Sequence, residues 1–137
     1  MLKISRHQER IWALQILYSL DLTGNLDSEQ YLEKVRVIKE ENMLAEADYY
    51  FEKIIRGVLE NYIEYDQLIN KTAIDWDIKR MAYVDRNILR ISLFEMNNEI
   101  PIGVVINEAV ELAKEYADEK SAKFINGILA KIAPRDK

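Results

Sequence analysis

Four residues near the start of the chain, Arg6, Arg10, Leu14 and Tyr18, follow one another at a spacing of four. Because residues four apart share one face of an α-helix, this spacing predicts a ridge with cations at its start and a ring at its end. Such a ridge suits single-stranded RNA, since cations contact phosphates and a ring stacks on a base. Spacing alone favours a second interpretation, in which Tyr18 is a core residue with its hydroxyl at the edge.

A similar combination occurs near the other end of the chain, where Phe124 follows Lys123. Residues 3–10 carry a net charge of +2 and residues 120–137 carry +4, whereas residues 27–64 carry −5. If the two ends meet in space, they form a basic patch able to contact several phosphates. Charge alone favours a simpler explanation, that charged chain ends serve solubility, and packing also explains Phe124.

No group of residues has the spacing of a catalytic or metal site. The chain has no cysteine and a single histidine, His7, which excludes thiolate sites and His-rich metal sites. Glu95 falls within an apolar helical arc, where an ion pair with Arg90 or Arg86 is the more usual role. Asp75 and Asp77 are typical of helix caps. The sequence therefore predicts no enzyme, no metal and no cofactor.

The elements that position these residues are helical almost throughout. The chain has 137 residues, a net charge of −5 and 49% hydrophobic residues, as expected for one globular domain. Helices are predicted at 11–20, 28–40, 45–62, 62–72, 84–97, 104–116 and 121–132. The residues Thr23 to Asn25 are expected to end the first helix, Asp27 or Ser28 to cap the second, and Ser121 to cap the last.

Membrane association is not predicted. No apolar run approaches the ~20 residues of a membrane-spanning helix. Residues 1–10 are polar and lack the apolar centre of a signal peptide. We therefore expect a cytoplasmic protein.

Three segments together resemble the NusB family of transcription antitermination factors. They are ALQILYSLDL at 13–22, WDIKRMAYVDRNILRISLFEM at 76–96 and IPIGVVINEAVELAKEYADEKSAKFINGILAKI at 100–132. The resemblance covers nearly the whole chain apart from the second helix. It implies one all-α domain over residues 1–137, with about seven helices in two small packed bundles, at about 1–72 and about 73–137.

The resemblance also implies a function and partners. Members of the family bind the boxA element of nascent RNA together with NusE, a ribosomal protein. That complex joins NusA and NusG on RNA polymerase and suppresses premature termination, notably in ribosomal RNA operons. Some members form homodimers, which would mask the RNA face.

The family's RNA site maps onto the two basic ends of this chain, which reverses the preference for the simpler explanations of Tyr18 and Phe124. The residues implied are Arg6, His7, Arg10, Tyr18, Lys123, Phe124 and Asn126, with Asp85, Arg86 and Tyr116 near the same surface. Lys3 is added as a phosphate contact because of its charge beside this segment.

The N-terminal segment departs from the family pattern. Several arginines commonly precede Ala-Arg-Glu in the family, whereas residues 5–11 here are SRHQERI. Fewer cations and the added Glu9 predict modest, salt-dependent RNA binding by the protein alone, with greater reliance on the protein partner. The weakened arginine run also supports an alternative, a protein interaction module of the same fold without specific RNA recognition. An RNA-binding module of an RNA cytosine methyltransferase is disfavoured, because the chain ends soon after the last helix.

Overall fold

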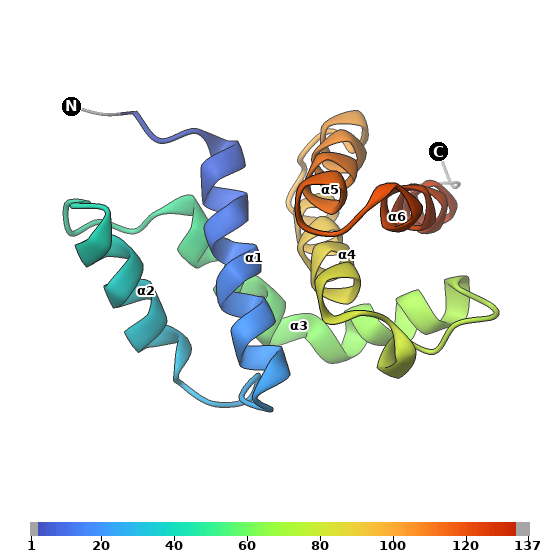
Figure 1. Cartoon of the computed structure of the whole chain (residues 1–137), viewed down its shortest axis with the longest axis horizontal. Helices are drawn as coiled ribbons and strands as arrows, with labels where there is room; N and C mark the ends of the chain where they lie inside the picture. Colours follow the sequence, from blue (N-terminus) through green and yellow to red (C-terminus); the bar gives the residue numbers. More distant parts are fainter. Residues whose placement is uncertain (1–2, 134–137) are drawn as a thin grey trace. The chain divides into compact units, whose positions relative to one another are not determined.

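The computed structural model describes residues 3–133, and within that range every regular element is a helix (Figure 1). These elements are α1 (Arg6–Leu22), α2 (Tyr31–Glu41), α3 (Tyr50–Thr72), the short 3-10 helix η1 (Ile78–Arg80), α4 (Tyr83–Asn97), α5 (Ile102–Tyr116) and α6 (Glu119–Ile132). The all-α prediction is confirmed. The described part of the chain has six α-helices, close to the seven expected.

The chain divides into two compact units, one ending at Glu60 and the other beginning at Asn61. This division falls inside α3. The expected boundary between the two bundles, at about residue 72, coincides with the end of that helix. The two predicted helices at 45–62 and 62–72 are one continuous helix, because no proline or glycine interrupts the chain near Tyr62. Buried Val58, Tyr65 and Ile69 keep the helical spacing across this point.

Helix α1 is the central helix of the first unit, as its nearly all-round apolar sequence predicted. It is buried along most of its length and begins earlier than expected, because Ser5 accepts a hydrogen bond from the Gln8 N–H at 3.0 Å and caps it. Its other end is closed by Gly24 at φ +72° and by the Asn25 N–H, which donates to the Leu20 carbonyl at 2.8 Å. The predicted left-handed C-terminal cap is confirmed.

The rest of the first unit packs on α1 through the start of α3. The Trp12 and Phe51 rings meet edge to face, with centroids 5.3 Å apart. Helix α2 contributes buried Val35. The expected cap of α2 was wrong: the helix begins at Tyr31, and Ser28 lies in the preceding turn, where its Oγ accepts from the Gln30 N–H.

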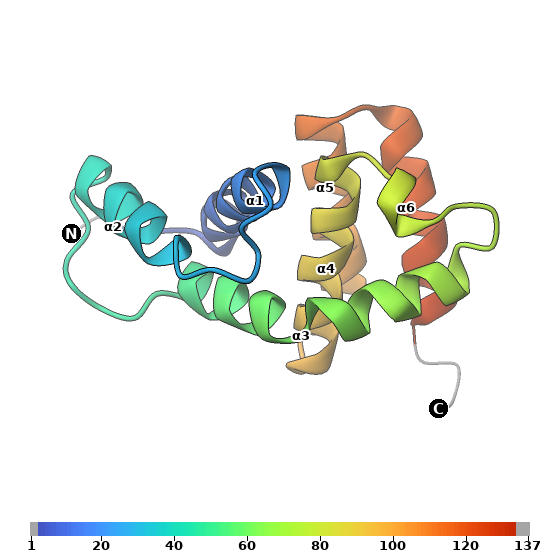
Figure 2. The same ribbon diagram turned by 90° about the horizontal axis from the view of Figure 1, so that it is seen from below.

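The second unit contains the last part of α3, η1 and helices α4 to α6 (Figure 2). Its core includes Ile88 and Leu89 of α4, Leu112 of α5 and Ile125 of α6, all of them buried. The expected cap of α6 was also wrong. Asp118 caps this helix by accepting from the Ser121 N–H at 2.7 Å, which leaves the Ser121 hydroxyl to donate to Asp85 on α4.

Candidate nucleic-acid interface

The residues expected to contact RNA fall into two sets, one on each unit. The first set lies on α1 and the residues just before it: Lys3, Arg6, His7, Arg10 and Tyr18. The second lies on α4, the end of α5 and the first half of α6: Arg86, Tyr116, Lys123, Phe124 and Asn126. Each set is described below within its own unit.

The N-terminal cations differ in their exposure. Lys3 and Arg6 are exposed, and His7 is half-buried. The Arg6 guanidinium lies over the Tyr50 ring, 4.2 Å from its centroid, and pairs with Glu9 at 3.2 Å. Both contacts are made by the guanidinium itself, although the Arg6 side chain is still 63% exposed. Arg6 therefore presents an oriented cation to solvent.

Arg10 and Leu14 are buried, so the predicted ridge on α1 is exposed only towards its ends. Arg10 is 5% exposed, and its guanidinium carbon lies 6.0 Å from the Tyr50 centroid. A cation in this position strengthens the packing between α1 and the start of α3. Tyr18, near the other end of the ridge, is half-buried.

Glu9 has a structural role that the sequence did not indicate. It is 5% exposed, and its Oε1 accepts the backbone N–H of Phe51 at 3.0 Å. Its Oε2 accepts from Arg6. Glu9 therefore caps the N-terminus of α3 from a different helix, with its charge compensated by a cation and by the helix dipole. The modest RNA binding expected from the added Glu9 and the few arginines stays a prediction.

The second set is centred on the start of α6. Lys123 and Asn126 are exposed, and Phe124 is half-buried. Their helix is well placed by the buried side chains of Ala122, Ile125 and Leu129. The helical spacing thus directs the apolar residues inward and leaves a cation, an amide and part of a ring at the surface.

Arg86 and Asp85 join α4 to its neighbours. The Arg86 guanidinium stacks on the Tyr83 ring at 4.3 Å and donates to the Ile78 carbonyl at 3.2 Å. Asp85 is 9% exposed, and its Oδ2 accepts from the Ser121 hydroxyl at 3.2 Å. Burial raises the pKa of the Asp85 carboxyl, and the charge of Asp118 adds to this, although the hydrogen bond from Ser121 opposes it.

Tyr116 lies at the C-terminus of α5 and is exposed. Partial burial and the neighbouring charge of Glu115 raise the pKa of its hydroxyl, which therefore stays protonated at neutral pH. Tyr116 can thus donate a hydrogen bond to an acceptor such as a phosphate or a base edge.

Sequence reasoning missed one aromatic residue of this surface, Trp76. The predicted capping role is confirmed for Asp77, since Asp77 accepts from the Lys79 N–H at the start of η1. Trp76 itself is 52% exposed and contacts Phe124, with centroids 6.1 Å apart. The sequence offers one signal for Trp76: it is a tryptophan that lies between two predicted helices and belongs to the apolar face of neither.

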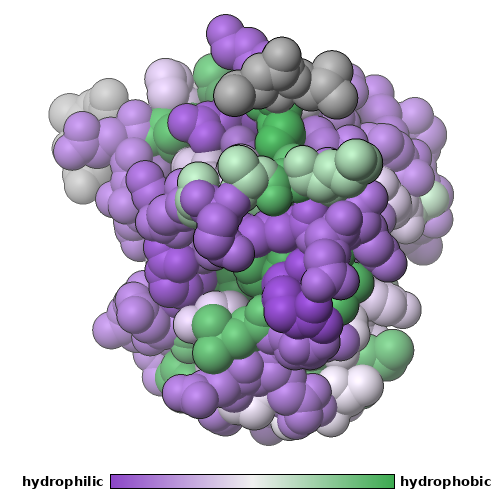
Figure 3. Space-filling model, turned by 90° about the vertical axis from the view of Figure 1, so that its left-hand side faces the viewer, coloured by the Kyte–Doolittle hydropathy of each residue, from purple (hydrophilic) through white to green (hydrophobic). Residues whose placement is uncertain are grey.

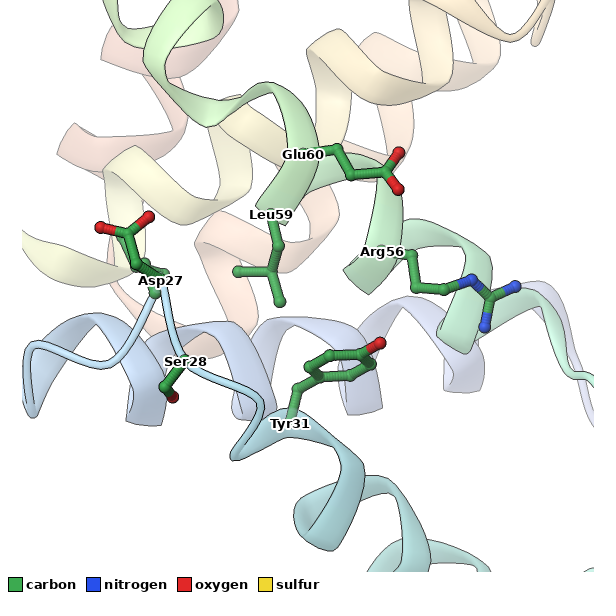
Figure 4. Close-up of a pocket in the computed structure, with 7 residues that line it drawn as sticks. Asp27, Ser28, Tyr31, Arg56, Leu59 and Glu60 are labelled. Carbon is green, nitrogen blue, oxygen red and sulfur yellow. The ribbon is translucent and has the colours of Figure 1, made fainter.

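A cavity of about 260 Å³ opens in the first unit between the α1–α2 loop, α2 and α3 (Figure 4). Tyr31 and Leu59 point towards each other there, with Asp27, Arg56 and Glu60 around them. Arg56 also pairs with Asp48 at 3.1 Å. The two carboxylates and the engaged arginine do not favour a polyanion, so this cavity is not part of the nucleic-acid interface.

One face of the molecule, shown in Figure 3, is largely hydrophilic with scattered hydrophobic patches.

No helix within residues 3–133 is long and apolar enough to cross a membrane. That range also contains no group of three or more histidine or carboxylate side chains able to hold a metal ion. The expected basic patch includes two residues of the C-terminal end, Arg135 and Lys137, that lie outside the described residues.

The sequence of this chain is similar to those of known proteins. The NusB family model matches residues 7–134. The transcription antitermination protein NusB of Halothermothrix orenii is 54% identical over 130 residues, which cover 95% of this chain and 97% of the relative.

Solved structures share the fold. T. maritima NusB is 33% identical with a TM-score of 0.78, over 96% of this chain and 92% of that one. A chain in the crystal structure of antitermination factors NusB and NusE in complex with dsRNA is 32% identical with a TM-score of 0.77, over 94% of this chain and 97% of that one.

Proposed function

This chain belongs to the NusB family, and on that premise we propose that it is a transcription antitermination factor and not an enzyme. In this proposal it binds boxA-type single-stranded RNA together with the ribosomal protein NusE. The complex joins NusA, NusG and RNA polymerase in the cytoplasm and helps the polymerase read through terminators, notably in ribosomal RNA operons. The observation that carries the proposal is the family match over residues 7–134, which includes every RNA-binding candidate except Lys3 and Arg6.

The exposed side chains support this function. Lys3, Arg6 and Lys123 supply cations for phosphates. Tyr18 and Phe124 are half-buried, so each ring is held by packing while part of it stays accessible for stacking on a base. Asn126 is exposed and offers both a donor and an acceptor to a base edge.

The remaining candidates act by positioning as well as by contact. Arg86 holds η1 through the Ile78 carbonyl, and its guanidinium charge suits a phosphate. Tyr116 is a hydroxyl donor at the end of α5. His7 is half-buried on the first turn of α1 and stays a candidate contact. Arg10 is assigned mainly to holding α1 against Tyr50.

The decisive experiment is fluorescence anisotropy of a labelled boxA-like RNA, measured with and without the NusE-type partner. A scrambled single strand and a duplex of the same sequence are the comparison RNAs, because the related NusB–NusE complex carries dsRNA. We expect a preference for the boxA strand that the partner tightens, and weaker binding by Tyr18→Ala and Phe124→Ala. Equal binding to all three RNAs, or none even with the partner, would refute the proposal.

The alternative function is a protein interaction module without specific RNA recognition. The small number of exposed N-terminal cations favours it, since Arg10 is buried and Arg6 pairs with Glu9. In that case the partner binds normally while the RNAs are not distinguished. Light scattering on the same samples measures whether the protein forms a homodimer. If RNA dissociates that dimer, the dimer contact lies on the RNA face.

A further inference from the structure

Trp76 lies in the turn that joins α3 to η1, beside the start of α6 within the second unit (Figure 2). Its side chain is 52% exposed, although tryptophan is among the side chains that gain most from burial. Ala73 and Ile78, which lie on either side of it in sequence, are both buried. These two residues hold the ends of the turn in the apolar core, while Trp76 between them is half exposed. Part of this indole therefore stays at the surface of a well-packed unit.

The turn that carries Trp76 is held at several points. The Trp76 N–H donates to the Ala73 carbonyl at 3.0 Å, and the Ile78 N–H donates to Asn70 Oδ1 at 2.6 Å. Arg86 donates to the Ile78 carbonyl from α4. These contacts fix the backbone of the turn, so binding of a flat ligand at Trp76 costs little backbone conformational entropy.

The Trp76 and Phe124 rings form an edge-to-face pair, with centroids 6.1 Å apart and planes at 72°. In this geometry the edge of one ring meets a face of the other, so neither ring is sandwiched by its partner. A base that stacks on the accessible part of Phe124 therefore also meets the indole. Of the two rings, Trp76 is the more exposed.

The charges around the pair place a nucleotide's phosphate on the α6 side. Asp75, Asp77, Lys79 and Arg80 surround Trp76 in sequence and cancel one another. From the N-cap to the end of α6, the exposed cations Lys120, Lys123 and Lys131 outnumber the exposed carboxylates Asp118 and Glu119. A strand whose phosphates follow the α6 lysines brings its bases over the aromatic pair.

We infer that Trp76 is a base-stacking residue for single-stranded RNA, forming one platform with Phe124. The inference rests on the proposed function and adds to it a residue outside the segments that the family resemblance assigned to RNA. A protein contact is the competing use of an exposed tryptophan. The exposed Lys120, one helical turn before Phe124 on the same face of α6, favours a nucleotide, because a protein hot spot is surrounded by residues that exclude water.

The chain allows a direct test, because it has two tryptophans and the other, Trp12, is buried against Phe51. In a Trp12→Phe protein, Trp76 is the only source of tryptophan emission. We expect the boxA-like RNA to quench that emission and to saturate at the concentration that saturates the anisotropy signal. Unchanged emission on full binding of RNA would overturn the inference.

Variants then measure the contribution of the ring. Trp76→Leu is expected to weaken RNA binding roughly 5- to 150-fold, the loss of stacking on one base, and Trp76→Phe to retain most of the affinity. The slope of log K against log salt should stay unchanged in Trp76→Leu, because stacking releases no counterions. Ile74→Ala is the matched control, since Ile74 is exposed in the same turn.

The outcomes separate the two proposals. If the unaltered protein binds none of the RNAs, the proposed function fails. If it binds boxA RNA and Tyr18→Ala weakens that binding while Trp76→Leu does not, only the Trp76 inference is wrong. If Trp76→Leu weakens binding of the NusE-type partner and leaves RNA binding unchanged, the turn contacts protein and the inference is overturned.

Discussion

The Oε1 atom of Glu9 accepts the backbone N–H of Phe51 at 3.0 Å, so a side chain of α1 caps the N-terminus of α3. The same α3 terminus is closed from within by Glu52, which accepts from the Tyr49 N–H at 2.8 Å. Glu52 also pairs with Lys39 of α2 at 3.0 Å. All three helices of the first unit therefore meet at the start of α3.

Replacing Glu9 with alanine should lower the free energy of unfolding by about 1–3 kcal/mol, because the buried Phe51 N–H loses its acceptor. Glu9→Gln keeps an acceptor oxygen and should lose less. Urea denaturation monitored by circular dichroism measures both. Glu29→Ala is the control, because Glu29 is an exposed carboxylate of the same unit. A Glu9→Ala protein as stable as Glu29→Ala would contradict the capping role.

In the second unit, Arg90 and Asp66 form a bidentate ion pair, with both N–O distances at 2.8 Å. The Arg90 side chain is 4% exposed, so removing its partner leaves a buried charge. Arg90→Met or Asp66→Leu alone should cost about 3–5 kcal/mol of stability. The double variant should lose clearly less than the sum, which a double-mutant cycle by urea denaturation measures. Additive losses would show that the two groups act independently.

Glu99 occupies a left-handed position, φ 65°, just after α4, where the Ile100 N–H donates back to the Glu95 carbonyl. A side chain with a Cβ is strained in this conformation, whereas glycine is not. We expect Glu99→Gly to raise the melting temperature, through about 1 kcal/mol of added stability. Gly24→Ala, at the equivalent position after α1, should produce a loss of similar size. The same sign of change in both variants would rule out this explanation.

Asp85 should make stability depend on pH in the direction opposite to that of most carboxylates. Its pKa is raised in the folded protein, so the folded state binds the proton more tightly than the unfolded state. The contribution of Asp85 is therefore most favourable below its ordinary pKa of about 4 and declines as pH rises through the folded value. Comparing urea denaturation of Asp85→Asn with the unaltered protein between pH 4 and 7 isolates this effect. The stability of Asp85→Asn relative to the unaltered protein should increase with pH; a constant difference would refute the prediction.

Lys123 and Arg10 should respond differently to substitution although both are candidate phosphate contacts. Lys123 is exposed, so Lys123→Ala should leave stability within ~0.5 kcal/mol and reduce the salt slope of RNA binding by about 1. Arg10 is buried, so Arg10→Ala should lower stability by about 1–3 kcal/mol. Lys53→Ala, an exposed lysine of α3, is the charge control and should change neither quantity. An unchanged salt slope in Lys123→Ala would remove Lys123 from the interface.

The helical class and most helix positions were predictable because they depend on local patterns. Apolar residues recur at helical spacing in α1, α4, α5 and α6, and Gly24 is suited to the left-handed residue that ends α1. The starts of α2 and α6 were not predictable, because several adjacent Ser and Asp residues can each cap a helix. Asp118 caps α6 in place of Ser121, whereas α2 begins after Gln30 with no side-chain cap.

The candidate RNA-binding residues likewise show some features that depend on local sequence and others that depend on packing. The sequence by itself determined which cations and rings the chain carries near its two ends, since residue type and spacing are local properties. Only the tertiary structure decided that Glu9 and Arg10 are buried at the start of α3, because their burial depends on a helix about forty residues away in sequence. It also decided that Trp76 lies against Phe124, because a turn and a helix far apart in sequence meet only when the second unit packs its core.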